Sequence, residues 1–401
     1  MDALEMPRDV ARISGEVLRW ARRRADIQPE QLASAIGKGY TASHVLSWES
    51  GESFPTFRQA EIIADKLHVP FGILFMENPP ELSLPIPDLR TVSGEPPERL
   101  SLNFLEVIND CLVRQFWYAD ELTFQGVRSL PFVGRFNLAD DINGIAADIT
   151  SVLEINDDLR RRCSSWEEFL TELVDRSERV GVLIMRSSVV RHSTRRGLPV
   201  REFRGFAISN PLAPLVFINT KDARSAQIFT LAHELAHIWI GQSGISNSDP
   251  KRRIGDYASD IERFCNRIAA QVLVPDFNMA SHWDAAETAE ANIQRIASFH
   301  RVSRTVVAIR ARDTGRISFD TASRIIDGET AAFMHRRIAA SEREGGPSFW
   351  AIFGPRNSAR FTRTLVDAVI QGRVFYKDAA TLLGTKVSTL RRFLLRGEQG
   401  N

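Results

Sequence analysis

The sequence predicts a mostly α-helical protein with one small β-sheet, an α+β fold. Most of its 401 residues lie in stretches whose apolar positions recur every three to four residues, which is typical of helices. Between residues 180 and 219 the pattern changes to short apolar or alternating runs, which indicate strands. The apolar content of 43% and charged content of 25% are typical of globular proteins, and the length suggests two or three domains.

Composition narrows the class of protein further. A net charge of +1 gives no chain-wide attraction to nucleic acid or acidic membranes. Three widely spaced cysteines form no disulfide framework and no cysteine metal site. The acidic N-terminus lacks the apolar core of a signal peptide, and no run of about 18 apolar residues could span a membrane. We therefore expect a cytoplasmic protein without membrane segments.

Residues 8–77 predict a bundle of five short helices. Pro29 suits a first helical turn, Thr41 is a candidate N-cap, and Ser50-Gly51 ends the third helix. The expected helices cover residues 13–24, 29–36, 41–49, 56–67 and 71–76.

The order of these helices resembles the phage-repressor (XRE-like) type of helix-turn-helix. The resemblance rests on Trp48-Glu49-Ser50-Gly51 followed by Phe54-Pro55-Thr56. In that family the glycine closes the recognition helix, whose first residues reach base edges in the major groove. The resemblance implies DNA contacts from Ala42, Ser43, His44 and Ser47.

Charge leaves a second interpretation open for this domain. Residues 1–77 hold nine basic and eleven acidic side chains, a net charge of −2, whereas DNA affinity draws on Lys and Arg. The cluster Arg22-Arg23-Arg24 and Lys38 could form a local basic patch. The alternative is a docking module for a protein partner with the same fold.

A proline-rich stretch, residues 78–100, predicts a semi-rigid linker or else a surface loop. The domain at residues 101–342 opens with helices expected at 104–125, 138–155 and 156–179. Strands are expected at 180–185, 202–209 and 214–219, followed by a helix over 223–240 with Asp222 as candidate N-cap. If the strand near Phe206–Ser209 lies at the sheet edge, it can bind an extended peptide.

The helix over residues 223–240 contains the motif H-E-x-x-H. His233 and His237 are four residues apart, so both rings leave the same helical face and can hold one Zn²⁺. Glu234 lies beside the first ligand, where it can take a proton from a metal-bound water. The alternative is an amphipathic helix with two buried core histidines.

Zinc needs a third ligand, and Glu262 is the candidate. It shares one helical stripe with Asn266, Ala269 and Leu273, so its carboxylate faces inward. A buried carboxylate is costly unless it is paired or bound to metal. A salt bridge to Arg263 or Arg267 is the alternative, but those residues lie on other faces of the helix.

Residues 180–280 resemble the ImmA/IrrE metallopeptidases. That family carries H-E-L-x-H on one helix and a third-ligand Glu on a second, four residues before Asn or Asp. Glu262, Asn266, Ala269-Ala270 and Leu273-Val-Pro275 match this pattern, with Cys265 where Ala is common. The resemblance implies a thermolysin-like zinc domain that cleaves a regulatory protein, such as a repressor or antitoxin-like partner.

The combined motifs predict metal-assisted peptide hydrolysis. Zn²⁺ on His233, His237 and Glu262 would activate a water, with Glu234 as general base. Tyr257 is a possible group for stabilising the oxyanion. The alternative function is a DNA-binding regulator or antitoxin whose zinc is structural or sensory, although such a site has no use for Glu234. A latent peptidase is a third possibility.

Three further helices are expected between the metal-site motif and residue 342. Residues 288–299 and 302–314 resemble a helix-turn-helix pair, which in the ImmA/IrrE family belongs to the peptidase domain, and 321–342 forms a further helix. His282 and His300 lack ligand spacing, and Lys251-Arg252-Arg253 lies in a polar loop.

A C-terminal region, residues 347–401, is basic and helical. From Pro355 it holds nine basic and three acidic residues, a net charge of +6, with short helices expected at 358–371, 376–383 and 387–395 around Gly384. It could bind nucleic acid, cover the peptidase domain or hold an acidic partner.

Overall fold

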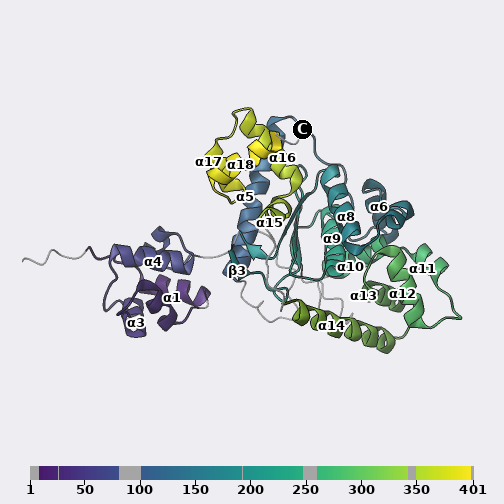
Figure 1. Cartoon of the computed structure of the whole chain (residues 1–401), viewed down its shortest axis with the longest axis horizontal. Helices are drawn as coiled ribbons and strands as arrows, with labels where there is room; N and C mark the ends of the chain where they lie inside the picture. Colours follow the sequence, from purple (N-terminus) through teal and green to yellow (C-terminus); the bar gives the residue numbers. More distant parts are fainter. Residues whose placement is uncertain are drawn as a thin grey trace, which may run out of the picture. The chain divides into compact units, whose positions relative to one another are not determined.

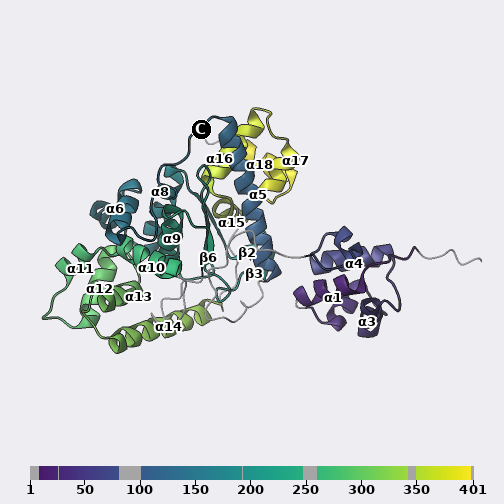
Figure 2. The ribbon, with the colours of Figure 1, turned by 180° about the vertical axis from the view of Figure 1, so that it is seen from behind.

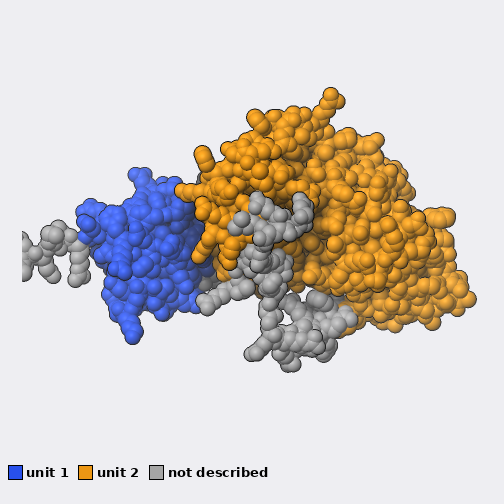
Figure 3. Space-filling model, turned by 45° about the horizontal axis from the view of Figure 1, so that its top comes forward, with its two compact units in different colours: residues 1–85, 99–105 blue, residues 86–98, 106–401 orange. Residues whose placement is uncertain are grey.

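The computed structural model describes residues 9–25, 27–80, 101–191, 193–246, 260–341 and 349–398. The chain divides into two compact units, residues 1–85 with 99–105 and residues 86–98 with 106–401 (Figure 3). The fold is α+β, as expected: helices dominate, and one four-stranded sheet lies in the larger unit (Figure 1). No helix in the described ranges is both long and apolar enough to cross a membrane.

The smaller unit is the expected bundle of five short helices, the last a 3-10 helix. Thr41 and Thr56 take part in capping boxes at two helix starts, and Gly51, with φ of 79°, ends the third helix in the left-handed conformation. Its helices are α1 (Gly15–Arg24), α2 (Pro29–Ile36), α3 (Ala42–Ser50), α4 (Phe57–Leu67) and η1 (Phe71–Phe75).

A buried ion pair in this unit changes the interpretation of the arginine cluster. Arg22 on α1 is only 8% exposed, and its Nε donates to a carboxylate oxygen of Glu49 on α3 at 2.6 Å. Arg24 lies over the Trp20 ring, and only Arg23 is fully exposed. Arg22 therefore holds two helices together and is not part of a surface patch for phosphate.

The larger unit includes α5 (Leu102–Phe124) from residue 106 onward, and α6 (Ile142–Val152) follows. The helix expected over residues 156–179 is divided into α7 (Asp157–Arg162) and α8 (Trp166–Val180). Asn156 and Ser165 each cap one of them, accepting backbone N–H groups of Leu159 and Glu168. The N-cap residue Ser165 lies inside the apolar helical pattern of residues 156–179 and marks where α8 begins.

The sheet has the strand order β1-β5-β4-β6. Its strands are β1 (Leu183–Ser187), β5 (Leu215–Asn219), β4 (Gly205–Ile208) and β6 (Gly244–Ser246), and a separate hairpin joins β2 (Val189–Val190) to β3 (Ser193–Gly197). β1 and β5 are parallel, and the other two pairs are antiparallel. The expectation that residues 206–209 form an edge strand is wrong, because β6 pairs with the other side of β4.

Helices cover the sheet, as both ribbon views show (Figures 1 and 2). α9 (Arg224–Trp239) packs on β4 and β5, and α10 (Asp260–Leu273) lies between α9 and α6. α15 (Phe349–Asn357) packs on β1. The chain continues through α11 (Asp276–His282), α12 (Ala289–His300), α13 (Arg304–Asp313) and α14 (Phe319–Ser341), and ends with α16 (Ala359–Ile370), α17 (Tyr376–Leu382) and α18 (Val387–Glu398).

Candidate metal centre

Helix α9 is anchored at its start by its own polar residues. Gln227 is fully buried, and its amide donates to the carbonyl oxygen of Asp222 at 2.8 Å. The expected N-cap role of Asp222 is wrong: Ala223 occupies the N-cap position, and the Asp222 carboxylate pairs with Arg204 at 2.6 Å. The other carboxylate oxygen of Asp222 accepts the Ala223 N–H at 2.9 Å, one residue before the helix.

The end of α9 is held by a turn far upstream in the sequence. The N–H groups of Gly134 and Phe136 donate to the carbonyls of Ile238 and Trp239 at 3.0 and 3.1 Å. These carbonyls are among the last of the helix, where the i+4 hydrogen bonds of a helix run out, and the Ile238 carbonyl also accepts the Gly241 N–H at 3.1 Å. Trp239 donates its indole N–H to Asp148 at 2.8 Å. Both ends of α9 are thus fixed against the surrounding core.

Three donor groups converge between α9 and α10. The Nε2 atoms of His233 and His237 lie 3.1 Å apart, and the two Glu262 carboxylate oxygens lie 3.1 Å from His237 Nε2 and 3.3 Å from His233 Nε2. Both histidines are fully buried, and Glu262 is 5% exposed. The structure therefore brings together the three residues that the sequence singled out, from two helices.

The spacing of these donors fits one small cation. Tetrahedral zinc with bonds of about 2.0–2.1 Å places neighbouring ligand atoms about 3.3 Å apart, close to the observed separations. Two imidazole nitrogens and one carboxylate oxygen form the kind of ligand set that zinc takes in catalytic sites. Among the described residues these three form the one group of three or more His, Cys, Asp or Glu with metal-ligand spacing.

Burial and charge act on the site in opposite directions. Burial alone would raise the pKa of Glu262, but the charges and hydrogen bonds of the two imidazoles outweigh it and hold this pKa well below its ordinary value. Burial lowers the pKa of His237, which favours the neutral ring that a metal requires. Burial also raises the pKa of the Cys265 thiol well above its ordinary value, and the charges of Glu262 and Glu234 add to this effect.

Glu234 lies directly against β4. It is fully buried, and a Cβ atom built on Gly205 would lie 2.8 Å from its Oε1 and 2.7 Å from Thr230 Cγ2. Only glycine at position 205 lets the helix and the strand approach this closely. Sequence reasoning missed this residue, although a glycine inside an alternating strand is the signal that could have found it.

Helix α10 places Glu262 through its apolar face. Ile268, Ala269 and Leu273 are buried in the main core, on the side that faces α9 and α6. Arg160 donates to the carbonyls of Val272 at 3.1 Å and His300 at 2.9 Å, which ties α10 to α12. The position of Glu262 is therefore set by the core.

Other predicted residues lie outside this centre. Arg263 is exposed and pairs with Asp260, which agrees with the view that it does not neutralise Glu262. His282 and His300 contact each other with ring centroids 6.0 Å apart and do not join the donor group. Tyr257, the loop with Lys251-Arg252-Arg253 and most of the proposed linker fall outside the described residues.

The four predicted DNA contacts lie at the start of α3. Ser43 and His44 are exposed, whereas Ala42 and Ser47 are half-buried. Nδ1 of His44 accepts the Thr41 N–H at 3.2 Å, and the Ser47 hydroxyl lies 2.7 Å from that of Ser53. Their polar atoms thus have local partners, and DNA contact by these residues stays a prediction.

Comparison with known families supports a peptidase domain around this centre. No curated protein and no solved structure matches the chain. Residues 357–396 match a domain of unknown function, DUF8813. Residues 177–312, which carry both helices of the centre, match the IrrE N-terminal-like domain (Peptidase_M78), and this match supports a metallopeptidase-like domain of the ImmA/IrrE family.

Proposed function

We propose that this protein is a zinc-dependent endopeptidase that cleaves a regulatory protein in the cytoplasm. The observation that carries the proposal is the convergence of His233, His237 and Glu262 within 3.1–3.3 Å, with Glu234 beside the first ligand. The family match over residues 177–312 supports the same class of reaction.

Each residue of the centre has one role in this proposal. His233 and His237 bind the metal through Nε2, and Glu262 binds it through its carboxylate. When bound, zinc supplies Lewis acidity that polarises the scissile carbonyl and makes a water ligand more acidic. The Glu234 carboxylate takes the proton of the attacking water and passes it to the leaving amine. The close packing of Gly205 holds Glu234 in place for this transfer.

The substrate we propose is a repressor or an antitoxin-like partner. The resemblance to the ImmA/IrrE metallopeptidases supports this class of substrate. The bundle within residues 8–77 would act as a repressor-like helix-turn-helix that contacts DNA through α3, where Ser43 and His44 are exposed and Ala42 and Ser47 are half-buried. It would deliver the peptidase to DNA or to the partner itself.

Glu234→Gln tests the proposal, because the amide cannot accept the proton but leaves the three ligands intact. Each variant is co-expressed with the protein encoded by the neighbouring gene, and zinc content is measured alongside the cleavage pattern. We expect about one zinc per chain throughout, as one catalytic site requires. A partner fragment should appear with the natural chain and with the exposed control Glu290→Gln, and disappear with Glu234→Gln.

Two results would contradict the proposal. A fragment that persists in Glu234→Gln would show that cleavage does not use this base. Regulation of the partner that survives in the same variant without any fragment would favour the alternative function, a DNA-binding regulator or antitoxin with structural or sensory zinc.

A further inference from the structure

Helices α17 and α18 form a tight pair at the end of the larger unit. They are joined by Leu383-Gly384-Thr385-Lys386, and Gly384 has φ of 61°, in the left-handed region that glycine adopts readily. Two helices joined by a turn of three or four residues with a glycine have the layout of a helix-turn-helix. Residues 357–396, which include both, match a domain of unknown function.

Packing decides which side of α18 faces solvent. Ala379 and Ala380 are buried on α17, and these small side chains let α18 approach closely. Leu383 in the turn and Leu390 on α18 are buried as well. The opposite side of α18 is therefore directed outward.

The pair is fixed to the rest of its unit by arginines. Arg114 on α5 donates to the carbonyl of Leu382 at 2.8 Å, and Arg356 donates to that of Leu383 at 2.7 Å. Both guanidinium groups cap the C-terminal end of α17, where cations are favourable.

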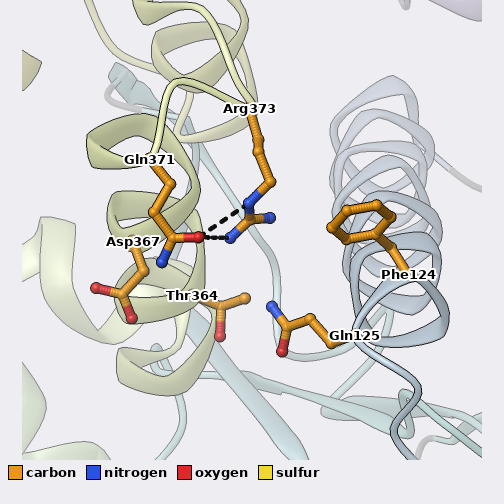
Figure 4. A pocket seen from close by; sticks show the side chains of 6 residues that line it. All are labelled: Phe124, Gln125, Thr364, Asp367, Gln371 and Arg373. Atoms are coloured by element: carbon orange, nitrogen blue, oxygen red, sulfur yellow. Dashed lines mark hydrogen bonds between the residues drawn. The ribbon is translucent and has the colours of Figure 1, made fainter.

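The connection from α16 to α17 is held in a similar way. A pocket there is lined by Phe124, Gln125, Thr364, Asp367, Gln371 and Arg373 (Figure 4). Arg373 hydrogen-bonds Gln371 at 2.8 Å and pairs with Glu121, so its charge serves to anchor this turn. These contacts connect the turn between α16 and α17 to α5.

The outward side of the pair is basic. Lys386, Ser388, Arg391 and Arg392 are exposed, and in the described part of the chain the three cations form no ion pair. The Arg391 guanidinium lies 5.6 Å from the centroid of the Tyr376 ring. Residues 376–394 hold four basic side chains and one acidic one. Exposed cations without carboxylate partners fit a polyanion.

Two other helix pairs are also joined by short connections but have different surroundings. In the pair α12–α13 the second helix is part of the main core, and none of its residues 304–312 is exposed. In the pair α2–α3 the second helix belongs to a segment, residues 1–77, with a net charge of −2. Helix α18 differs from both because its free side is exposed and positively charged.

We propose that α17 and α18 form a DNA-binding helix-turn-helix, with α18 in the major groove of duplex DNA. Arg391 and Arg392 would contact base edges or phosphates, and Lys377 and Lys386 would contact phosphates. The arginines that hold the pair fix it to the same compact unit as the metal centre. This proposal is independent of proteolysis.

The test is binding of the full chain to a fluorescent duplex of about 30 base pairs at several salt concentrations, followed by anisotropy. Arg391→Ala with Arg392→Ala should weaken binding about tenfold or more. The slope of log K against log salt should become shallower by about 1.8 if both arginines contact phosphates. The matched control, Arg128→Ala with Arg179→Ala, removes two exposed arginines elsewhere in the unit and should bind as the natural chain does.

Further variants separate charge from folding and one DNA site from the other. Arg391→Lys with Arg392→Lys keeps both charges and should retain the salt slope, whereas Glu234→Gln should bind DNA normally. Three results would overturn the proposal: no DNA binding by the natural chain, unchanged binding by the double alanine variant, or capture of an acidic protein in place of DNA. Loss of binding in Ser43→Glu together with unchanged binding in the double alanine variant would assign the DNA contact to α3 in place of α18.

Discussion

Replacing Gly205 with alanine should disturb the candidate active site without touching a metal ligand. The new Cβ would lie 2.8 Å from Glu234 Oε1, 2.7 Å from Thr230 Cγ2 and 2.9 Å from the carbonyl oxygen of Phe217. All three separations are shorter than ordinary van der Waals contact. Phe217 is the register partner of Phe206 in the β4–β5 ladder, so its carbonyl cannot move freely. The strain must fall on α9, and on Glu234 in particular.

The size of the effect follows from these contacts. Overpacking of this kind costs about 1–3 kcal/mol in the free energy of unfolding. A displacement of about 1 Å in a catalytic group can lower a reaction rate about a hundredfold. None of the three atoms nearest to the new methyl group belongs to His233, His237 or Glu262, so zinc content should stay unchanged. The prediction is a modest loss of stability with a large loss of cleavage.

Stability is measured by denaturant unfolding, metal content by zinc analysis, and activity by the cleavage rate of the natural partner. Gly328→Ala is the matched control, because a Cβ there meets no atom within 4 Å and the residue lies inside α14. The reasoning is wrong if Gly205→Ala has the same free energy of unfolding and the same cleavage rate as this control. The close approach of β4 to Glu234 would then matter neither for stability nor for catalysis.

Two further predictions concern buried charge. Arg22→Ala should cost the smaller unit about 3 kcal/mol, because Glu49 is 5% exposed and loses its shortest ion pair, whereas Arg23→Ala at an exposed position should change stability by less than about 0.5 kcal/mol. Hydrogen exchange of α1 and α3 measures both, and equal protection in the two variants would contradict the argument. Burial lowers the pKa of His300 to about 3, whereas the pKa of a histidine in the unfolded chain is about 6.5. As the pH falls, the unfolded chain therefore binds this proton before the folded chain does. The neutral His300 ring therefore contributes fully to the free energy of unfolding above about pH 6.5. This contribution falls by about 1.4 kcal/mol per pH unit as the pH decreases toward about 3. His300→Phe should remove that part of the slope of unfolding free energy against pH, and an unchanged slope would show that another group is responsible.

Much of the fold could be predicted because helix signals are local. The hydrogen bonds that cap a helix start join residues only three positions apart. Such caps or capping boxes are formed by Thr41, Thr56, Ser165 and Ser303. Strand β6 was missed because three residues with a glycine give no periodic signal. Helices α11 and α15 were missed as well.

The sequence by itself determined some helix boundaries, such as the start of α3 at Thr41 and its end at Gly51, and the helical face that His233 and His237 share, because these depend on a few neighbouring residues. It also singled out Glu262, since a carboxylate on an apolar stripe demands a partner. Only the tertiary structure decided that β6 pairs with β4, that Gly205 packs closely against Glu234, and that Arg22 is buried with Glu49. It also decided that α13 is buried while α18 is exposed. These outcomes depend on pairing and packing between residues far apart in the chain, which no local pattern encodes.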